Sequence, residues 1–398
     1  METELKVRKN KLTERKFLYQ FLPISLEKIS NTKKFIYKDK ELKSAYVVDL
    51  IHNLLLKYYF KKENVFNLSA VILKEKYGYL YNYYINFLID EELLILLKKH
   101  SSGKNARVYK MNDKIINQNI QRYKNFDSVL LKKYNKIISS LKNSEFDKNL
   151  IDVDVKQKLI NDLFYVEVDF SKSLYFLDQS IQDLDVYNRN RYSVESIINK
   201  NIFYHFDNYG RLHTNFTILK SFIRKNCLII DGEETCEIDI KNSQPLFLNK
   251  LFNKNNVGDL SELSLFRYLT IEGKFYQYLQ EKLNIINKKQ VKEITYKVLF
   301  GKNTKNKIDT GFSKIFPNIH RVIKEFKSEA KDYRALSYKL QRLESEFIFN
   351  KVIKSINNNY PNIILITVHD SIICKKSDQK VVESVFYDYM SQEFDNLD

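Results

Sequence analysis

The spacing of apolar residues in the first third of the chain predicts helices followed by a two-stranded ribbon. Apolar pairs recur every three to four residues from Ala45 to Phe60, which is the period of an amphipathic helix. Ser69 is suited to capping the helix that follows it, and Gly78 marks a turn. The predicted helices span residues 45–60, 69–76 and 79–89, and the predicted strands span 93–97 and 107–110.

This order resembles a winged helix-turn-helix domain, which we place at residues 41–115. In such a domain the second helix of the motif lies in the major groove and the wing touches phosphate. The basic loop at residues 101–105 would be the wing. The alternative is that the same fold serves as a protein-contact module.

The remaining boundaries follow from changes in pattern. Residues 1–40 are basic and weakly periodic, which predicts an N-terminal arm, and residues 116–200 predict a helical linker or thumb-like region. Residues 201–398 hold strand-like segments as well as helices. Only 8 Gly and 4 Pro occur, so long helices should dominate. The predicted fold class is therefore α+β and helix-rich.

Composition narrows the class of partner. Lys and Arg number 66 against 49 Asp and Glu, a formal net charge of +17, which favours a polyanion such as nucleic acid or an anionic membrane. No apolar stretch approaches the roughly 20 residues that a bilayer span needs, so we expect no membrane partner. The three cysteines have no paired spacing, and the polar N-terminus does not resemble a signal peptide. These features predict a cytoplasmic protein.

Two aspartates stand at the ends of strand-like segments in the C-terminal half. Asp239 follows residues 236–238, and Asp370 follows the apolar run 363–368 in what should be a hairpin with His369 in its turn. Carboxylates on neighbouring strands can hold two Mg²⁺ ions about 3.5–4 Å apart. Taken singly, each aspartate fits a helix cap or a surface residue equally well.

Between the aspartates lies a helix with one chemically distinctive edge. Lys288, Lys292, Tyr296 and Phe300 recur every four residues and therefore lie along one side of that helix, which ends at Gly301. Two cations followed by two aromatic rings suit the triphosphate and base of a nucleotide. An ordinary amphipathic helix with a lysine-lined edge is the alternative.

Upstream, the segment Asp207-x2-Gly210-Arg211 combines a flexible backbone position with a guanidinium. Glycine would let the backbone approach a duplex while Arg211 reaches bases or phosphates. A turn with a surface ion pair would give the same sequence.

Taken in order, these segments resemble the palm and fingers of family A DNA polymerases and of the related phage-type single-subunit RNA polymerases. The resemblance covers roughly residues 203–376 and lies in motifs rather than in continuous identity. It implies that residues 201–398 form a polymerase palm, built on an antiparallel sheet, with helical fingers. It also implies a DNA template–primer duplex and nucleoside triphosphates as partners.

The resemblance implies specific roles. Asp239 and Asp370 would be the metal ligands for two Mg²⁺ ions, with Mn²⁺ as an alternative, and His369 would flank the primer end. Lys292 would contact the triphosphate and protonate the departing pyrophosphate. The residues implied to hold the nucleotide are Gln244, Lys288, Lys292, Tyr296 and Phe300, and those implied to hold nucleic acid are Asp207, Arg211, Gly301 and Gln341.

Departures from the family pattern bear on the substrate. Gln244, five residues past Asp239, stands at the sugar gate, where its size should crowd a 2′-hydroxyl. Phe300 lacks the tyrosine hydroxyl of the RNA enzymes, which also favours deoxynucleotides. Lys288 replaces the usual arginine, and Ser371 stands where many DNA enzymes have glutamate.

The leading hypothesis is a metal-dependent, DNA-directed DNA polymerase of a phage, plasmid or other mobile element. One alternative is a single-subunit RNA polymerase with the same core. Another is a non-catalytic replication initiator that binds DNA through the winged helix. Protein-primed or template-independent synthesis is a further alternative.

Overall fold

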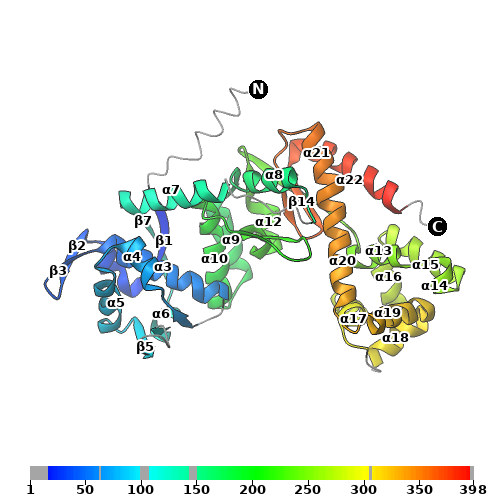
Figure 1. Ribbon diagram of the computed structural model, residues 1–398, viewed down its shortest axis with the longest axis horizontal. Coiled ribbons are helices and arrows are strands. Elements are labelled where there is room, and N and C mark those ends of the chain that lie inside the picture. The colour runs from blue at the N-terminus through cyan, green and yellow to red at the C-terminus, as the bar shows by residue number, and fades with distance from the viewer. Residues whose placement is uncertain (1–16, 62–63, 99–106, 143–149, 304–306, 395–398) are drawn as a thin grey trace. The chain divides into compact units, whose positions relative to one another are not determined.

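The computed structural model describes residues 17–61, 64–98, 107–142, 150–303 and 307–394 (Figure 1). The fold is α+β and helix-rich, and the paired strands within each unit are antiparallel. Contacts divide the chain into two compact units whose segments interleave. The first unit comprises residues 1–144, 164–203 and 218–231, and the second comprises 145–163, 204–217 and 232–398. The four consecutive parts expected from the sequence stay a prediction.

The first unit begins with strand β1 (Leu18–Pro23), which pairs with β7 (Ile120–Asn125). Residues 18–23 were expected in a basic arm, but Phe21 and Leu22 are fully buried because this stretch is locally apolar. The other elements are η1 (Ile24–Leu26), α2 (Glu27–Ser30), β2 (Lys34–Tyr37), β3 (Lys40–Lys43), α3 (Ser44–Lys61), β4 (Val65–Asn67), α4 (Ala70–Tyr77), α5 (Tyr81–Asp90), β5 (Leu94–Lys98), β6 (Val108–Met111), α6 (Asp113–Ile116), α7 (Ser128–Lys142), β8 (Val166–Val168), α9 (Phe170–Ser180), α10 (Leu184–Ile198), α12 (Ser221–Cys227) and β11 (Leu228–Ile230).

Helices α3, α4 and α5 are followed by strands β5 and β6, the order that the apolar spacing predicts. Ser69 caps α4, since its hydroxyl accepts a hydrogen bond from the Ile72 amide at 3.5 Å. Strand β4 joins the ribbon, and the sheet order is β4-β6-β5. The loop at residues 101–105, expected to be the wing, lies outside the described residues, and the winged-helix interpretation stays a prediction.

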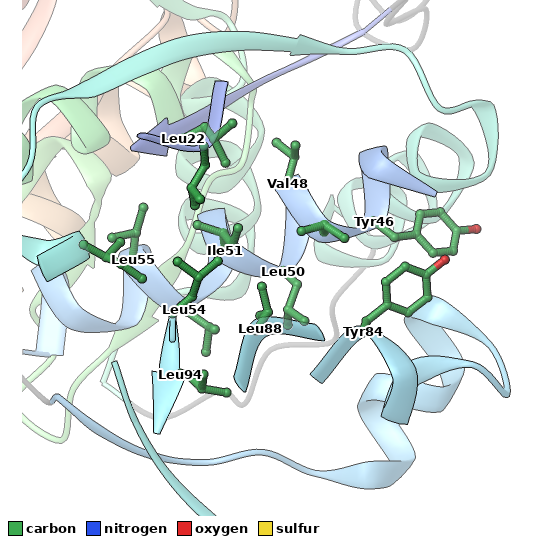
Figure 2. Packing of buried hydrophobic residues seen from close by; sticks show 14 of the residues in the cluster. Leu22, Tyr46, Val48, Leu50, Ile51, Leu54, Leu55, Tyr84, Leu88 and Leu94 are labelled. Carbon is green, nitrogen blue, oxygen red and sulfur yellow. The ribbon is translucent and has the colours of Figure 1, made fainter. Parts of the chain in front are cut away.

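The core of this unit is built around α3. Figure 2 shows Leu50 and Leu54 of α3 pointing toward Leu88 of α5 and Leu94 of β5, and all four side chains are buried. Burying a leucine contributes about 1.5–3 kcal/mol relative to leaving it exposed. Packing of one helix face against α5 and the ribbon therefore holds these elements together.

A single carboxylate lies inside that core. Asp49 of α3 is fully buried and accepts hydrogen bonds from the side chains of four residues at 2.5–2.9 Å, Gln20, Lys76, Tyr77 and Tyr134. Burial alone would raise its pKa, but the ammonium and the hydroxyl of Tyr77 hold the pKa below its usual value. The Asp49 carboxylate therefore has hydrogen-bond donors within the protein for both of its oxygens.

The second unit carries three antiparallel sheet strands in the order β12-β14-β13. Its strands are β12 (Glu233–Asp239), β13 (Ile366–Val368) and β14 (Ser371–Lys375), and β9 (Tyr204–Phe206) pairs separately with β10 (Leu212–Thr214). Cys236 and Cys374 face each other in the register of β12 and β14, with their sulfurs 3.5 Å apart. The sequence spacing of the cysteines did not indicate this pair.

Helices form the rest of the second unit. They are α8 (Val153–Leu163), α11 (Asn215–Ile218), α13 (Ser243–Leu248), η2 (Asn249–Leu251), α14 (Lys254–Val257), α15 (Leu260–Ile271), α16 (Phe275–Leu283), α17 (Lys288–Phe300), α18 (Lys307–Ile315), α19 (Pro317–Glu329), α20 (Ala335–Ser345), the π-helix η3 (Glu346–Ile353), α21 (Lys354–Asn359), η4 (Lys376–Asp378) and α22 (Gln379–Phe394). Helix α11 runs one residue past the boundary of the unit. Figure 1 shows α20, η3 and α21 as one unbroken coil (orange). Helices α13 and α17 both pack on α20. None of the described helices is both long and apolar enough to cross a membrane.

Candidate active site

A cavity of about 720 Å³ opens in the second unit where the sheet, α13, α17 and α20 meet. Polar and aromatic side chains line it, which suits a charged ligand better than an apolar one. Its lining residues are Arg211, Asp239, Ile240, Lys241, Asn242, Ser243, Gln244, Gly273, Tyr276, Lys288, Lys292, Tyr296, Phe300, Gln341, Glu344, His369 and Asp370.

The sheet brings the two aspartates of the sequence motifs to this cavity. Asp239 is the last residue of β12 and lies directly across from Ser371, the first residue of β14. Residues opposed in this way have Cα atoms about 4.5–5.5 Å apart. Asp370 precedes Ser371 in the two-residue turn between β13 and β14. The two carboxylates therefore project from neighbouring backbone positions, and the hairpin expected around His369 is present.

Both aspartates are next to unusual backbone. His369 has φ of 56°, and Asn242, three residues past Asp239, also has φ of 56°. Non-glycine residues in this left-handed region are uncommon and cluster at functional sites. Asn242 starts α13, so its conformation turns the chain from the end of β12 into that helix.

A third carboxylate, Glu344 of α20, lies buried against the cavity wall. It accepts hydrogen bonds from Arg211 at 2.5 Å, from the Ser243 hydroxyl at 2.7 Å and from the Gln244 amide at 2.5 Å. One carboxylate therefore ties the Arg211 turn and the start of α13 to α20.

Asp370 has a pKa raised to about 7. Removal from water is the largest cause, followed by the nearby negative charges of Glu344 and Asp239, which a hydrogen bond with Ser243 offsets only in part. Negative charge is thus concentrated locally around Asp370, although the cavity lining as a whole also includes Arg211, Lys241, Lys288 and Lys292. A cation bound beside the carboxylates would relieve that local repulsion.

Helix α17 presents its polar ridge to the cavity, because its other face, including Val291 and Leu299, is buried. Lys288, Lys292, Tyr296 and Phe300 all line the cavity. The rings of Tyr296 and Phe300 stack with their centroids 5.5 Å apart.

Tyr276 of α16 also lines the cavity, beside this ridge. The Lys292 ammonium lies 5.4 Å from the centre of its ring. Cations and flat rings therefore follow one another along a single wall of the cavity.

The Arg211 turn is rigid. Asp207 Oδ1 accepts hydrogen bonds from the backbone amides of Tyr209 and Arg211 at 2.9 and 3.0 Å. Gly210 has φ of +85°, and a Cβ there would come within 3.2 Å of the Ser345 Cβ. Asp207 therefore shapes the turn and does not itself line the cavity, whereas Arg211 does.

The two remaining predicted nucleic-acid contacts differ in placement. Gln341 lines the cavity and donates a hydrogen bond to the Ser337 hydroxyl at 2.9 Å. Gly301 ends α17 and does not line the cavity. A Cβ at Gly301 would lie 2.4 Å from the Lys297 carbonyl oxygen, so close packing against its own helix already requires glycine.

Gln244, the predicted sugar gate, is buried at the cavity wall. An ionised carboxylate can only accept, so the Glu344 bond fixes the amide nitrogen toward Glu344. The gate side chain is therefore held in one orientation rather than left free to swing.

Sequence reasoning missed Glu344, Ser243 and Tyr276. Glu344 follows Gln341 by three residues on one helix, so the two share a face, and that spacing was the available signal. Ser243 precedes the predicted gate Gln244, but its partner Glu344 lies 101 residues along the chain, and no pattern near Tyr276 indicated a place at the site.

The donor set suits a hard divalent cation. Among the described residues, no group of three or more histidine, cysteine or acidic side chains is arranged to hold a metal. Asp239 and Asp370 would thus be the protein ligands. Mg²⁺ is commonly held by one or two carboxylates, with water and substrate phosphates completing its shell.

Comparison with solved structures finds similar chains. The chain is similar to the POL domain of Pol1 from M. smegmatis in complex with DNA primer-template and dNTP, with 11% sequence identity and a TM-score of 0.45, over 66% of this chain and 70% of that chain. No family model and no curated protein matches. At this level the likeness assigns neither a family nor an activity, which are argued from the site.

Proposed function

We propose that the chain is a template-directed nucleotidyltransferase that adds nucleotides to a 3′-hydroxyl. One observation carries the proposal: Asp239 and Asp370 project from adjacent strands into a single cavity that the cationic and aromatic ridge of α17 also lines. The raised pKa of Asp370 supports it, because strongly shifted carboxyls gather where charge is poised for function.

In this proposal each wall of the cavity has a task. Asp239 and Asp370 would hold divalent cations, which would supply activation of the attacking hydroxyl and stabilisation of the departing pyrophosphate. Lys288 and Lys292 bind the triphosphate, and Lys292 is placed to give a proton to the leaving group. Tyr296 and Phe300 offer flat faces to the base.

The duplex side of the cavity belongs to Arg211 and Gln341, with His369 beside the primer end. Arg211 is held by Glu344 and stands on a turn that Asp207 fixes. A guanidinium held in this way presents its remaining donors in a fixed direction, which suits contact with bases or phosphates.

We further propose DNA synthesis on a DNA template, in a phage, plasmid or other mobile element. Support comes from Gln244, whose bulk is fixed against the cavity wall by Glu344. A rigid side chain at the sugar gate should exclude a 2′-hydroxyl more effectively than a mobile one.

The test is primer extension with Mg²⁺, a primed DNA template and deoxynucleotides. Asp239→Asn and Asp370→Asn should each lower the incorporation rate at least about 1,000-fold, the scale seen when groups essential to catalysis are removed. Asp388→Asn changes an exposed carboxylate on α22 and is the matched control. Extension by either cavity variant at the wild-type rate contradicts the proposal.

Ribonucleotides in the same assay separate the two polymerase alternatives. Gln244→Gly should raise the ratio of ribonucleotide to deoxynucleotide incorporation about tenfold or more, the effect expected for relief of one steric contact. A wild-type preference for ribonucleotides would favour the RNA polymerase. Absence of any Mg²⁺-dependent incorporation, with DNA binding retained, would favour the non-catalytic initiator.

A further inference from the structure

We propose that Tyr209 and Tyr338, with the arginines beside them, form a binding surface on which the bases of a single nucleic-acid strand stack. This surface lies outside the cavity residues and has no part in the chemistry proposed above. It rests on the proposed function only for the identity of the strand, which would be the unpaired template. Binding itself requires neither metal nor nucleotide.

The two rings form a tight parallel stack. Their centroids lie 4.2 Å apart and their planes differ by 9°. Tyr209 belongs to the rigid Gly210 turn and Tyr338 to α20, so two separately fixed elements hold the rings. Both side chains are half-buried rather than part of the core, and the neighbouring Tyr333 is 39% exposed.

An arginine lies near each ring. The guanidinium carbon of Arg334 is 5.8 Å from the centre of the Tyr338 ring, and that of Arg342 is 5.9 Å from the centre of the Tyr209 ring. Both arginines are exposed. Both bring a guanidinium close to the tyrosine pair, and Arg334 also pairs with Asp332, its Nε lying 3.2 Å from Oδ1.

A half-buried arginine in the first unit shows what a closed stack looks like. The Arg122 guanidinium lies 3.2 Å from the centre of the Tyr19 ring and 3.8 Å from that of Phe170, at contact distance. Arg334 and Arg342 lie farther from their rings, at 5.8 and 5.9 Å against 3.2 and 3.8 Å. Their guanidiniums are therefore not packed at contact distance on the tyrosine rings, as that of Arg122 is on its two rings.

This chemistry fits an unpaired strand. Aromatic faces stack on any base, and arginine supplies phosphate contacts and cation–π contacts, the combination used by proteins that bind single strands. In a duplex the base faces are already covered by their neighbours. The net charge of +17 favours the same class of partner.

The position of the surface supports the inference. Tyr209 is two residues from Arg211, and Tyr338 is three residues from Gln341 on the same helix. Both of those residues line the cavity. A strand stacked on the tyrosine pair would therefore lie next to the site where we propose that synthesis takes place.

The experiment measures fluorescence anisotropy of a labelled 20-nucleotide oligo(dT) and of a labelled blunt DNA duplex, without Mg²⁺ or nucleotides. The double variant Tyr209→Leu/Tyr338→Leu keeps apolar contact but removes the aromatic faces. We expect it to weaken single-strand binding about 10- to 100-fold, the range for loss of one or two base-stacking contacts. Duplex affinity should change less than about threefold.

Two further variants separate stacking from structure. Tyr209→Phe/Tyr338→Phe retains the rings and should retain wild-type affinity, and Tyr387→Leu, at a 54% exposed tyrosine of α22, should have no effect. Single-strand affinity of the leucine variant within about twofold of wild type overturns the proposal. Equal losses for single strand and duplex also overturn it, because the surface would then bind the backbone.

Photocrosslinking covers the case in which the leucine variant does not fold. Oligonucleotides that carry 5-iodouracil should crosslink to Tyr209 or Tyr338 in the wild-type chain, and crosslinks only elsewhere contradict the proposal. Failure of the two proposals can be distinguished. Strand binding that needs the rings, in a protein that never extends a primer, would overturn only the polymerase function.

Discussion

Two carboxylates, one in each unit, respond to their surroundings in opposite directions. Asp49 is fully buried in the first unit, which alone would raise its pKa, yet the Lys76 ammonium and the Tyr77 hydroxyl hold that pKa below its usual value. Asp370 lines the cavity of the second unit, and its pKa is raised to about 7 by burial together with Glu344 and Asp239.

The two carboxylates differ in how far the surrounding side chains neutralise their charge. Around Asp49 the protein supplies every partner, so that carboxylate contributes to stability and has nothing further to bind. Around Asp370 the charges that raise its pKa, those of Glu344 and Asp239, have the same sign, which costs stability in the absence of a cation. A site with uncompensated charge is a candidate for ligand binding, whereas a carboxylate whose charge is compensated by the protein is a candidate for stabilising the fold.

The largest expected effect on the free energy of unfolding comes from substitution of Asp49. Asp49→Asn leaves the Lys76 ammonium without its ionic partner, and removing one member of a buried ion pair costs about 3–5 kcal/mol. Urea unfolding at pH 7 should show that loss in the free energy of unfolding. Asp39→Asn, at an exposed aspartate of the same unit, is the control and should leave it unchanged. A loss below about 1 kcal/mol would mean that the network adds little beyond a surface pair.

A neighbouring histidine should make the first unit sensitive to acid. His52 is buried and accepts a hydrogen bond from the Phe21 amide, and burial lowers its pKa to about 4. A base with a lowered pKa contributes stability that is present above its ordinary pKa of 6.5 and is lost as the pH falls toward 4. The full shift of 2.5 pKa units corresponds to about 3 kcal/mol.

The measurement is the free energy of unfolding between pH 4 and 7. His52→Asn keeps an acceptor but cannot be protonated, so the histidine-dependent part of the decline should disappear. His205→Asn, at an exposed histidine, should leave the wild-type slope intact. Identical slopes for wild type and His52→Asn would show that His52 does not titrate with a lowered pKa.

The smallest expected effect on the free energy of unfolding comes from substitution of Asp370, which should stabilise the protein. A carboxyl with a raised pKa costs stability above that pKa, and the cost fades as the pH falls toward the ordinary value. Asp370→Asn should therefore stabilise the metal-free protein by about 1–2 kcal/mol at pH 8, and by less at each lower pH. Destabilisation at pH 8 would contradict the comparison drawn between Asp49 and Asp370.

Magnesium extends this test. Excess Mg²⁺ should raise the melting temperature of the wild-type protein, because a ligand that binds only the folded state stabilises it. Asp370→Asn should lose most of that rise. An equal rise in both proteins would place the cation elsewhere.

Local patterns predicted the parts of the site that depend on neighbours in sequence. The hairpin around His369 followed from apolar runs on both sides of a polar turn, and the four-residue spacing of Lys288 and Lys292 put both on one side of α17. These features need only strand alternation and helix geometry. The roles given to those residues stay predictions.

What the sequence could not indicate depends on contacts between distant segments. Glu344 bonds to residues 100, 101 and 133 positions away, and no periodicity encodes such partners. The facing sulfurs of Cys236 and Cys374 result from strand register in the same way. Strand β1 at Leu18–Pro23 lies within residues 1–40, where a basic arm was expected, because a short apolar run is buried there despite the basic composition around it.

The interleaving of the two units constrains how the protein can be dissected. A shortened chain that starts at residue 232 would lack α8 and the β9–β10 hairpin, which supplies Arg211, although both belong to the second unit. Glu344 would then keep its negative charge without its guanidinium partner. A minimal version of the second unit should therefore come from rejoining segments 150–163, 204–217 and 232–394 through engineered linkers, not from simple truncation.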